Sequence, residues 1–182
     1  MKKQNIITAS IIGATALLAA GSVLYFKSRK TEPEGAQVVK PFSVKKYLGK
    51  WHEIARLDFH FEKNLNNVTA EYSLNEDGSI KVVNRGHNYK TNKIEESVGK
   101  AKFAGDFDEG KLKVSFFGPI YASYNVIAID KSYRYALVAG RNLNYMWLLS
   151  RETSMPEDIK QDYLQKAKAL GYKTENLVWS EN

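Results

Sequence analysis

The chain has 182 residues, no cysteine and a formal net charge of +7. This length suits one domain with an appendage, and the lack of cysteine excludes disulfides, thiolate metal ligands, a cysteine nucleophile and cysteine-linked lipid. Five basic and no acidic residues lie in the first thirty positions, so residues 31–182 carry 22 basic against 20 acidic side chains. That near balance is typical of an ordinary solvated surface and disfavours nucleic-acid binding.

Residues 1–30 have the pattern of a membrane-targeting element: two lysines, an uncharged run over residues 4–26, and then a basic cluster. The run is long enough to span a bilayer as a helix, which favours an uncleaved anchor. Small residues at positions 19–22 also suit a signal peptidase, so a cleaved signal peptide is the alternative. Residues 31–43, which include Pro33, Gly35 and Pro41, are expected to form a linker, and residues 44–182 a folded domain.

The stretch WHEIARLDFH, residues 51–60, nearly matches the zinc-protease motif His-Glu-x-x-His. The motif needs a second histidine one helical turn after His52, so that both imidazoles reach one zinc ion. Arg56 stands at that position, and a guanidinium keeps its positive charge and cannot ligate a cation. Along a straight strand His52 and His60 lie up to roughly 27 Å apart, at about 3.4 Å per residue, so they do not share a metal either. We therefore predict no metal site.

From residue 51 to residue 151 the chain repeats short stretches of alternating apolar and polar residues, separated by turn signals. One stretch alternates Val68, Ala70, Tyr72 and Leu74 with polar residues and ends at an Asp-Gly turn. The pattern predicts eight strands, at residues 51–57, 68–74, 80–89, 95–104, 111–117, 121–129, 133–139 and 145–151. Eight antiparallel strands with hairpin spacing favour an all-β up-and-down barrel, because closure removes exposed sheet edges, and a two-sheet sandwich is the alternative.

One helix is expected after these strands. Ser154 followed by Glu157 resembles a capping box, and Pro156 suits the first helical turn. Apolar residues then recur at helical spacing in a single stripe that ends before Gly171. The residues of this stripe are Ile159, Tyr163, Ala167 and Leu170. We expect the stripe to pack on the outside of the barrel, and residues 177–179 to form a short strand that pairs with the barrel's edge.

Three regions resemble, in order and spacing, the signature regions of the lipocalin family. They are Gly49-x-Trp51 ahead of the first strand, Asp130-x-x-Tyr133 at the turn between the sixth and seventh strands, and Arg151 at the end of the eighth. Longer strings, among them LGKWHEIARLDFHFEKNL and KVSFFGPIYASYNVIAID, look like those of bacterial lipocalins of the Blc type. The resemblance covers about residues 43–180 and implies an eight-stranded antiparallel barrel with the C-terminal helix on its outside.

The resemblance implies structural roles for these five residues. In the family the tryptophan closes the narrow end of the barrel and the arginine lies across its indole face, an arrangement that stabilises by about 0.5–2 kcal/mol. Trp51 and Arg151 would form this plug, and Gly49 would let the chain approach closely. Asp130 and Tyr133 would tie the nearby turn.

At the opposite, open end the resemblance implies a ligand pocket inside the barrel. Alternation along the strands predicts which side chains line it, although a slip of one residue would reverse every choice. The predicted lining residues are Phe59, Val68, Ala70, Tyr72, Val114, Phe116 and Tyr124. The implied ligand is a fatty acid or lysophospholipid, stored or transported in the cell envelope, and burial of each methylene contributes about 0.8 kcal/mol. Another small apolar guest, such as a tetrapyrrole, isoprenoid or signal molecule, is the alternative.

We expect no cofactor, no catalytic residues and no enzymatic activity, because the chain has no thiol, no Gly-x-Ser-x-Gly motif and no phosphate-binding loop. A lipid-modifying enzyme is the weaker alternative. Blc-type relatives commonly carry an acylated cysteine for outer-membrane attachment, which this chain lacks, so membrane attachment would depend on residues 1–30. We expect a monomer or homodimer whose barrel lies outside the cytoplasm, either tethered to a membrane or free in the periplasm or outside.

Overall fold

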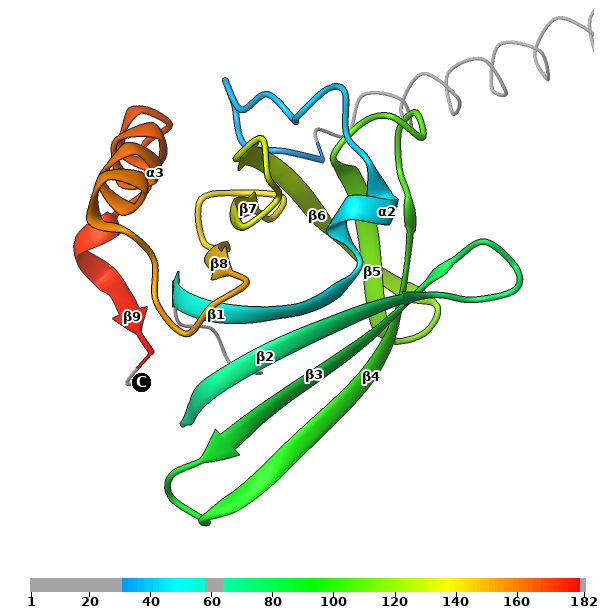
Figure 1. Ribbon diagram of the computed structural model, residues 1–182, viewed down its shortest axis with the longest axis horizontal. Coiled ribbons are helices and arrows are strands. Elements are labelled where there is room, and N and C mark those ends of the chain that lie inside the picture. The colour runs from blue at the N-terminus through cyan, green and yellow to red at the C-terminus, as the bar shows by residue number, and fades with distance from the viewer. Residues whose placement is uncertain (1–30, 58–63, 181–182) are drawn as a thin grey trace, which may run out of the picture. The chain divides into compact units, whose positions relative to one another are not determined.

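The strands of the protein form one antiparallel sheet that closes on itself, as the computed structural model shows (Figure 1). The structure describes residues 31–57 and 64–180. Its strands are β1 (Gly49–Leu57), β2 (Leu65–Leu74), β3 (Ile80–Asn88), β4 (Lys93–Phe103), β5 (Lys111–Phe117), β6 (Ile120–Ile129), β7 (Tyr135–Ala139), β8 (Met146–Ser150) and β9 (Leu177–Trp179). The first eight pair in sequence and β8 pairs with β1, which confirms the predicted eight-stranded barrel and excludes the sandwich.

Strand β1 closes the barrel, and one edge of this strand pairs with two different strands in turn. Its first residues pair with β2, from Gly49 opposite Tyr72 to His52 opposite Thr69. Its last residues pair instead with β9, from Ala55 opposite Trp179 to Leu57 opposite Leu177. The expected short strand at residues 177–179 therefore covers the part of the β1 edge that β2 leaves open, which removes an exposed edge.

Two apolar clusters lie on the two faces of this sheet. The inner cluster fills the barrel and includes Trp51, Val82 and Val138, whereas the outer cluster includes Leu137 and Leu148. Neighbouring residues of β7 alternate between the two clusters, and all five residues of that strand are buried. A strand buried on both faces needs no alternating polar residues, which explains why β7 has the continuous apolar sequence YALVA.

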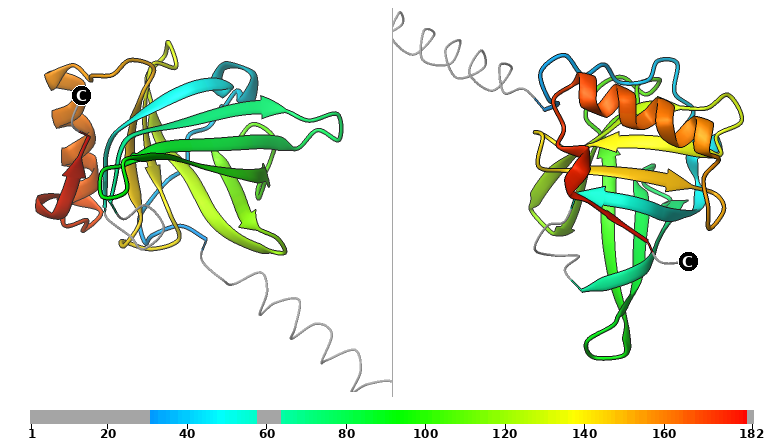
Figure 2. Two further views of the ribbon diagram at one scale, coloured as in Figure 1. Left: turned by 90° about the horizontal axis from the view of Figure 1, so that it is seen from below. Right: turned by 90° about the vertical axis from the view of Figure 1, so that its left-hand side faces the viewer.

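Helix α3 (Glu157–Ala169) covers the outer cluster. Figure 2 shows it lying across the outside of the barrel wall, as the apolar stripe predicted. Tyr163 and Ala167 are its buried residues, and the Tyr163 hydroxyl donates a hydrogen bond to the carbonyl of Tyr135 (3.0 Å). The predicted capping box is wrong, since the helix begins after Pro156 without a side-chain cap. The carbonyl of Ser154 instead accepts a hydrogen bond from the Ser150 hydroxyl (2.8 Å).

The segment 31–43, expected to be a linker, lies along the barrel. The amide of Val39 donates to the carbonyl of Val126 (2.8 Å), and the Phe42 ring belongs to the inner cluster. The Lys40 ammonium pairs with Asp106 and Glu109 in the turn between β4 and β5. Residues 31–43 thus form part of the folded unit, which begins at residue 31 and also contains two short helices, α2 (Val44–Tyr47) and η2 (Thr174–Asn176).

The predicted membrane-targeting element, residues 1–30, lies outside the described residues. In the part of the chain that the structure does describe, none of the helices is both long and apolar enough to cross a membrane.

Candidate functional site

One end of the barrel is closed by Trp51, whose side chain is completely buried. Its indole nitrogen donates to the carbonyl of Tyr47 (2.8 Å), and the Arg151 guanidinium lies 3.9 Å from the centre of its ring. The guanidinium also donates to backbone carbonyls of five residues: Lys46, Tyr47, Leu48, Lys50 and Tyr133. A β-carbon at Gly49, where φ is +93°, would lie only 3.4 Å from the same guanidinium. Arg151 thereby joins α2, β1 and the turn before β7.

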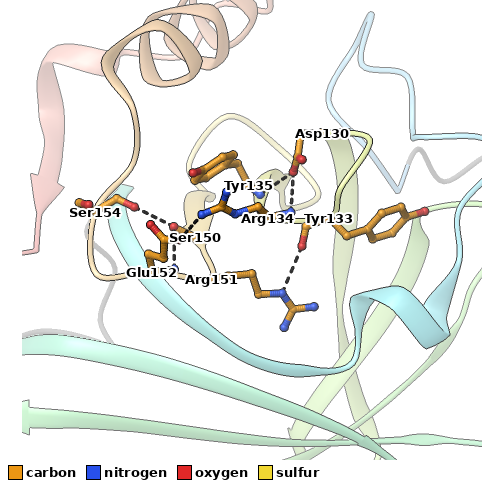
Figure 3. Close-up of polar contacts among 8 residues, drawn as sticks. All are labelled: Asp130, Tyr133, Arg134, Tyr135, Ser150, Arg151, Glu152 and Ser154. Atoms are coloured by element: carbon orange, nitrogen blue, oxygen red, sulfur yellow. Dashed lines mark hydrogen bonds and ion pairs between the residues drawn. The ribbon is translucent and has the colours of Figure 1, made fainter.

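The turn between β6 and β7 is organised by the Asp130 carboxylate, which accepts hydrogen bonds from the amides of Ser132, Arg134 and Tyr135 (2.6–2.9 Å). Figure 3 shows two of these bonds, with Arg151 bonded to the Tyr133 carbonyl beside them. Tyr133 occupies the left-handed region at φ 58°, and its hydroxyl accepts a hydrogen bond from the amide of Ser43 (2.8 Å). The turn is therefore tied to the segment that leads into α2.

Three tyrosines form a hydrogen-bonded cluster on the barrel side of this plug. The Tyr124 hydroxyl lies 2.6 Å from the Tyr47 hydroxyl and 2.8 Å from the Tyr72 hydroxyl. The Tyr47 ring packs on Trp51, with centroids 4.8 Å apart. Burial raises the pKa of both Tyr47 and Tyr124 well above the ordinary tyrosine value, so these hydroxyls stay neutral, and either partner of each pair can donate the hydrogen bond. We refer to Tyr47, Tyr72 and Tyr124 as the tyrosine triad.

Beyond the triad, the inner face of the barrel retains accessible surface. Four of the predicted lining residues are only partly buried although they pack against the inner cluster: Ala70, Val114, Phe116 and Tyr124. Tyr72 faces the same interior but is only 8% exposed, because the other two tyrosines of the triad cover it. Val68 is 5% exposed, and a β-carbon at Gly86 would lie 3.1 Å from its methyl carbon, so it offers little surface to a ligand. The remaining predicted residue, Phe59, lies outside the described residues.

Sequence reasoning missed Trp147 on this inner wall. It lies in β8 opposite Arg56, packs against the inner cluster and stacks on Tyr124, with ring centroids 6.5 Å apart and planes at 27°. The alternation of Trp147 and Leu149 with Met146 and Leu148 carries the signal, because those two pairs fall into the inner and outer clusters respectively. Together with Tyr124, it gives the interior a flat aromatic surface.

A buried ion pair also faces the interior, and sequence reasoning missed this too. The Arg56 guanidinium donates to the Glu53 carboxylate at 2.6 Å, and both side chains are less than 5% exposed. Their cross-strand partners, Trp147 and Leu149, belong to the inner wall, and residues opposite each other share a face of a sheet. Arg56 also donates to the Leu65 carbonyl (3.2 Å), which joins β1 to the start of β2. Arg56, which stands where the zinc motif has its second histidine, thus pairs with Glu53, the glutamate of the same motif.

The near-miss zinc motif does not assemble a metal site in the described residues, which contain no group of three potential histidine, cysteine or carboxylate ligands. His52 lies opposite Ser150, on the face of β1 away from Glu53. His87 contacts the side chains of Asn66 (3.1 Å) and Asn92 (2.9 Å). His60 lies outside the described residues.

A hollow of about 560 Å³ lies on the outer surface, between the loop from β7 to β8 and the end of α3. Its lining combines two leucines with polar groups: Leu57, Leu143, Asn144, Gly171, Lys173 and Asn176. Because it is open and lacks aromatic side chains, we regard the barrel interior as the better candidate for an apolar ligand.

Comparison with known proteins agrees with this architecture. Residues 42–182 match the sequence model of the family described as Lipocalin-like domain. The outer membrane lipoprotein Blc of Citrobacter freundii is 44% identical over 93% of this chain and 96% of its own length. That of Escherichia coli (strain K12) is 46% identical over 84% of this chain and 86% of its own. Rat (Rattus norvegicus) apolipoprotein D is 37% identical over 66% of this chain and 67% of its own.

Among solved structures, insecticyanin from the tobacco hornworm Manduca sexta superposes with a TM-score of 0.65 at 20% identity, over 84% of each chain. Lobster apocrustacyanin A1 gives 0.64 at 17% identity, over 84% of this chain and 91% of its own. At such identities these two likenesses support the fold alone, whereas the sequence matches establish descent. The chain belongs to the lipocalin family, with its lipocalin-like domain at residues 42–182.

Proposed function

We propose that the protein is a carrier, not an enzyme, that buries the acyl chain of a fatty acid or lysophospholipid inside the barrel. One observation carries the proposal. Apolar and aromatic side chains that face the barrel interior are only partly buried, and the end of the barrel behind them is closed by Trp51. Val114, Phe116 and Trp147 are the clearest examples. A space closed at one end by Trp51 suits a molecule with an apolar tail and a polar head, because the tail can enter while the head stays at the mouth.

The energetics fit such a ligand. Each methylene that leaves water contributes about 0.8 kcal/mol, so a tail of a dozen or so carbons supplies roughly 10 kcal/mol before the cost of immobilisation. The tyrosine triad and the Glu53–Arg56 pair already use hydrogen-bonding groups on one another. The aromatic rings therefore present mainly apolar faces to the interior.

We place this activity in the cell envelope, because the relatives named Blc are outer membrane lipoproteins. The chain has no cysteine for lipid attachment, so we assign membrane attachment to the apolar segment within residues 1–30. The name of another relative, apolipoprotein D, also associates the family with lipid.

Native mass spectrometry of the full chain, purified in a mild detergent and then released from it, tests the proposal directly. We expect masses of fatty acids or lysophospholipids bound one per barrel. A coloured or nitrogen-rich guest of another class would contradict the acyl-lipid assignment and favour the alternative apolar ligands. Hydrolysis of lipid esters by the purified protein, lost on changing His52, would contradict the assignment as a carrier.

A matched pair of substitutions locates the site. Val114→Phe adds bulk inside the barrel, whereas Val98→Phe adds the same bulk on the outer face, where Val98 is 52% exposed. We expect the first change to weaken binding of a fluorescent fatty acid about tenfold and the second to leave it unchanged. Thermal unfolding of both variants checks that they remain folded. Equal binding by parent and both variants would exclude the barrel interior as the site.

A further inference from the structure

Three hairpins at the open end of the barrel expose unusually many large apolar side chains. In an up-and-down barrel alternate turns lie at the same end, so the β3–β4, β5–β6 and β7–β8 turns lie opposite the end that Trp51 closes. We define the rim hairpins as residues 89–94, 117–121 and 140–145. Seven of the twelve exposed large hydrophobic residues in the described part of the chain belong to them, namely Tyr89, Ile94, Phe117, Ile120, Tyr121, Leu143 and Tyr145.

The three most exposed of these are two isoleucines and a phenylalanine, and they lie close to the turns. Ile120 is 77% exposed, and Ile94 and Phe117 are each 69% exposed. Soluble monomers rarely gather exposed apolar residues in one region, and such a region usually marks a binding surface. The surface lies at the end of the barrel opposite Trp51, where a barrel ligand would enter.

The charges on the same hairpins identify the kind of surface that they fit. The rim hairpins contain Lys90, Lys93 and Arg141 and no acidic residue. The Lys113 ammonium, behind the β5–β6 turn, lies 5.4 Å from the centre of the Tyr121 ring. The carboxylate of Glu95, next along the chain, accepts a hydrogen bond from the side-chain amide of Asn88 (2.7 Å). Basic side chains beside exposed apolar and aromatic tips are the combination that binds the interface of an anionic bilayer.

We propose that the rim hairpins dock the barrel, mouth first, on an anionic phospholipid membrane. The aliphatic tips enter the boundary between headgroups and acyl chains, and the three basic residues lie at the phosphate layer. Docking needs no ligand in the barrel, so it goes beyond the proposed function. Only its consequence rests on that function: a lipid tail could then pass between bilayer and barrel without crossing water.

The absence of cysteine allows a clean test in the full chain, because a single introduced cysteine takes an environment-sensitive dye at one position. We compare Ile120→Cys on the rim with Leu74→Cys, which replaces a residue 46% exposed at the opposite end of the barrel. Both chains contain residues 1–30, so any binding through that segment is common to both. On vesicles of phosphatidylglycerol and phosphatidylcholine, we expect a blue shift at position 120 and none at position 74.

The electrostatic part is tested by the triple variant Lys90→Gln, Lys93→Gln, Arg141→Gln in the Ile120→Cys background. We expect the vesicle concentration for half-maximal blue shift to rise roughly a hundredfold, and added salt to weaken vesicle binding by the parent protein similarly.

The apolar part of the proposal is tested by Ile94→Ser in the Ile120→Cys background, with Val98→Ser as its control on the outer wall. We expect the vesicle concentration for half-maximal blue shift to rise about tenfold for Ile94→Ser and to stay unchanged for Val98→Ser.

Several results would overturn the proposal. Equal shifts at positions 74 and 120, or equal shifts on purely phosphatidylcholine vesicles, would exclude mouth-first docking on anionic lipid. A shift at position 120 without vesicles that grows with protein concentration would identify a second copy as the partner. Native mass spectrometry is a separate readout, so a chain that carries acyl lipid but shows no shift at position 120 would contradict docking and leave the carrier function standing.

Discussion

The two ends of the barrel are built from opposite kinds of interactions. At the closed end Trp51 is wholly buried, and Arg151 donates hydrogen bonds to carbonyls of α2, β1 and the β6–β7 turn. At the open end the rim hairpins expose isoleucine and aromatic side chains to solvent. The closed end joins parts of the chain some hundred residues apart. The rim hairpins join neighbouring strands, and their longer-range contact is the hydrogen bond that the Tyr172 hydroxyl donates to the Tyr145 carbonyl (3.2 Å).

This difference indicates how stability and function are divided in the molecule. Side chains whose contacts link residues some hundred positions apart, as Arg151 does with Lys46 and Lys50, fix the barrel's closure. Rim side chains make few such contacts, so substitutions there should leave folding intact and change binding. If so, substitutions at the closed end lower the free energy of unfolding more than matched substitutions elsewhere.

Trp51→Ala should have the largest effect. Replacing a fully buried tryptophan by alanine costs about 3–5 kcal/mol in the free energy of unfolding, measured by urea denaturation. Trp179→Ala is the matched control, because Trp179 is 43% exposed in the edge strand β9, and its loss should cost less than about 1 kcal/mol. Equal losses would mean that the plug contributes no more than an edge residue. Loss of ligand binding at unchanged stability would show that Trp51 belongs to the pocket.

Arg151→Ala should have the next largest effect, about 2–3 kcal/mol, because it leaves several carbonyls without their charged donor. Arg151→Lys should recover only part of this loss, since an ammonium cannot both lie flat on the indole and reach carbonyls on several sides. Arg134→Ala is the control at the same end: Arg134 pairs with Glu152 at the surface, and such pairs contribute about 1 kcal/mol or less. A loss for Arg134→Ala as large as for Arg151→Ala would argue against the plug.

The strand pattern could be predicted from the sequence because alternation survives wherever one face of a strand meets solvent. Strand β2 illustrates this, since the predicted lining residues Ala70 and Tyr72 face the inner cluster. Strand β1 illustrates the limit. Its register with β8 shifts between Glu53 and Ala55, so Ile54 and Ala55 both join the outer cluster, and simple alternation from Trp51 fails there.

The candidate site was less predictable than the fold for the same reason. The Glu53–Arg56 pair depends on that irregularity, because the shift returns Arg56 to the inner face beside Trp147. The tyrosine triad depends on the path of the segment before β1, which carries Tyr47 into the barrel. Neither arrangement leaves a periodic signal in the sequence. The roles of Trp51 and Arg151 in closing the barrel could be expected only from the family resemblance, because no alternation or spacing within this chain pairs the two residues.

The tyrosine triad should produce a smaller effect, visible only at alkaline pH. Burial holds the pKa of Tyr47 and Tyr124 well above the value of about 10 that tyrosine has in an unfolded chain. Above pH 10 the unfolded chain therefore releases protons that the folded barrel keeps, so the free energy of unfolding falls as the pH rises. Urea denaturation between about pH 9 and 11.5 should show this decline, and Tyr124→Phe, which removes one of the groups, should make it shallower.

Tyr89→Phe is the matched control, because it removes a hydroxyl from a ring that is 56% exposed, and its decline should equal that of the parent. Tyr124→Phe also removes two hydrogen bonds, so it lowers stability at every pH, but a constant loss leaves the slope unchanged. The slope, not the stability itself, therefore reports the buried hydroxyl. Equal slopes for parent and Tyr124→Phe would mean that the triad ionises without unfolding. Hydroxide would then reach the tyrosine triad through the open end of the barrel, although Trp51 closes the other end.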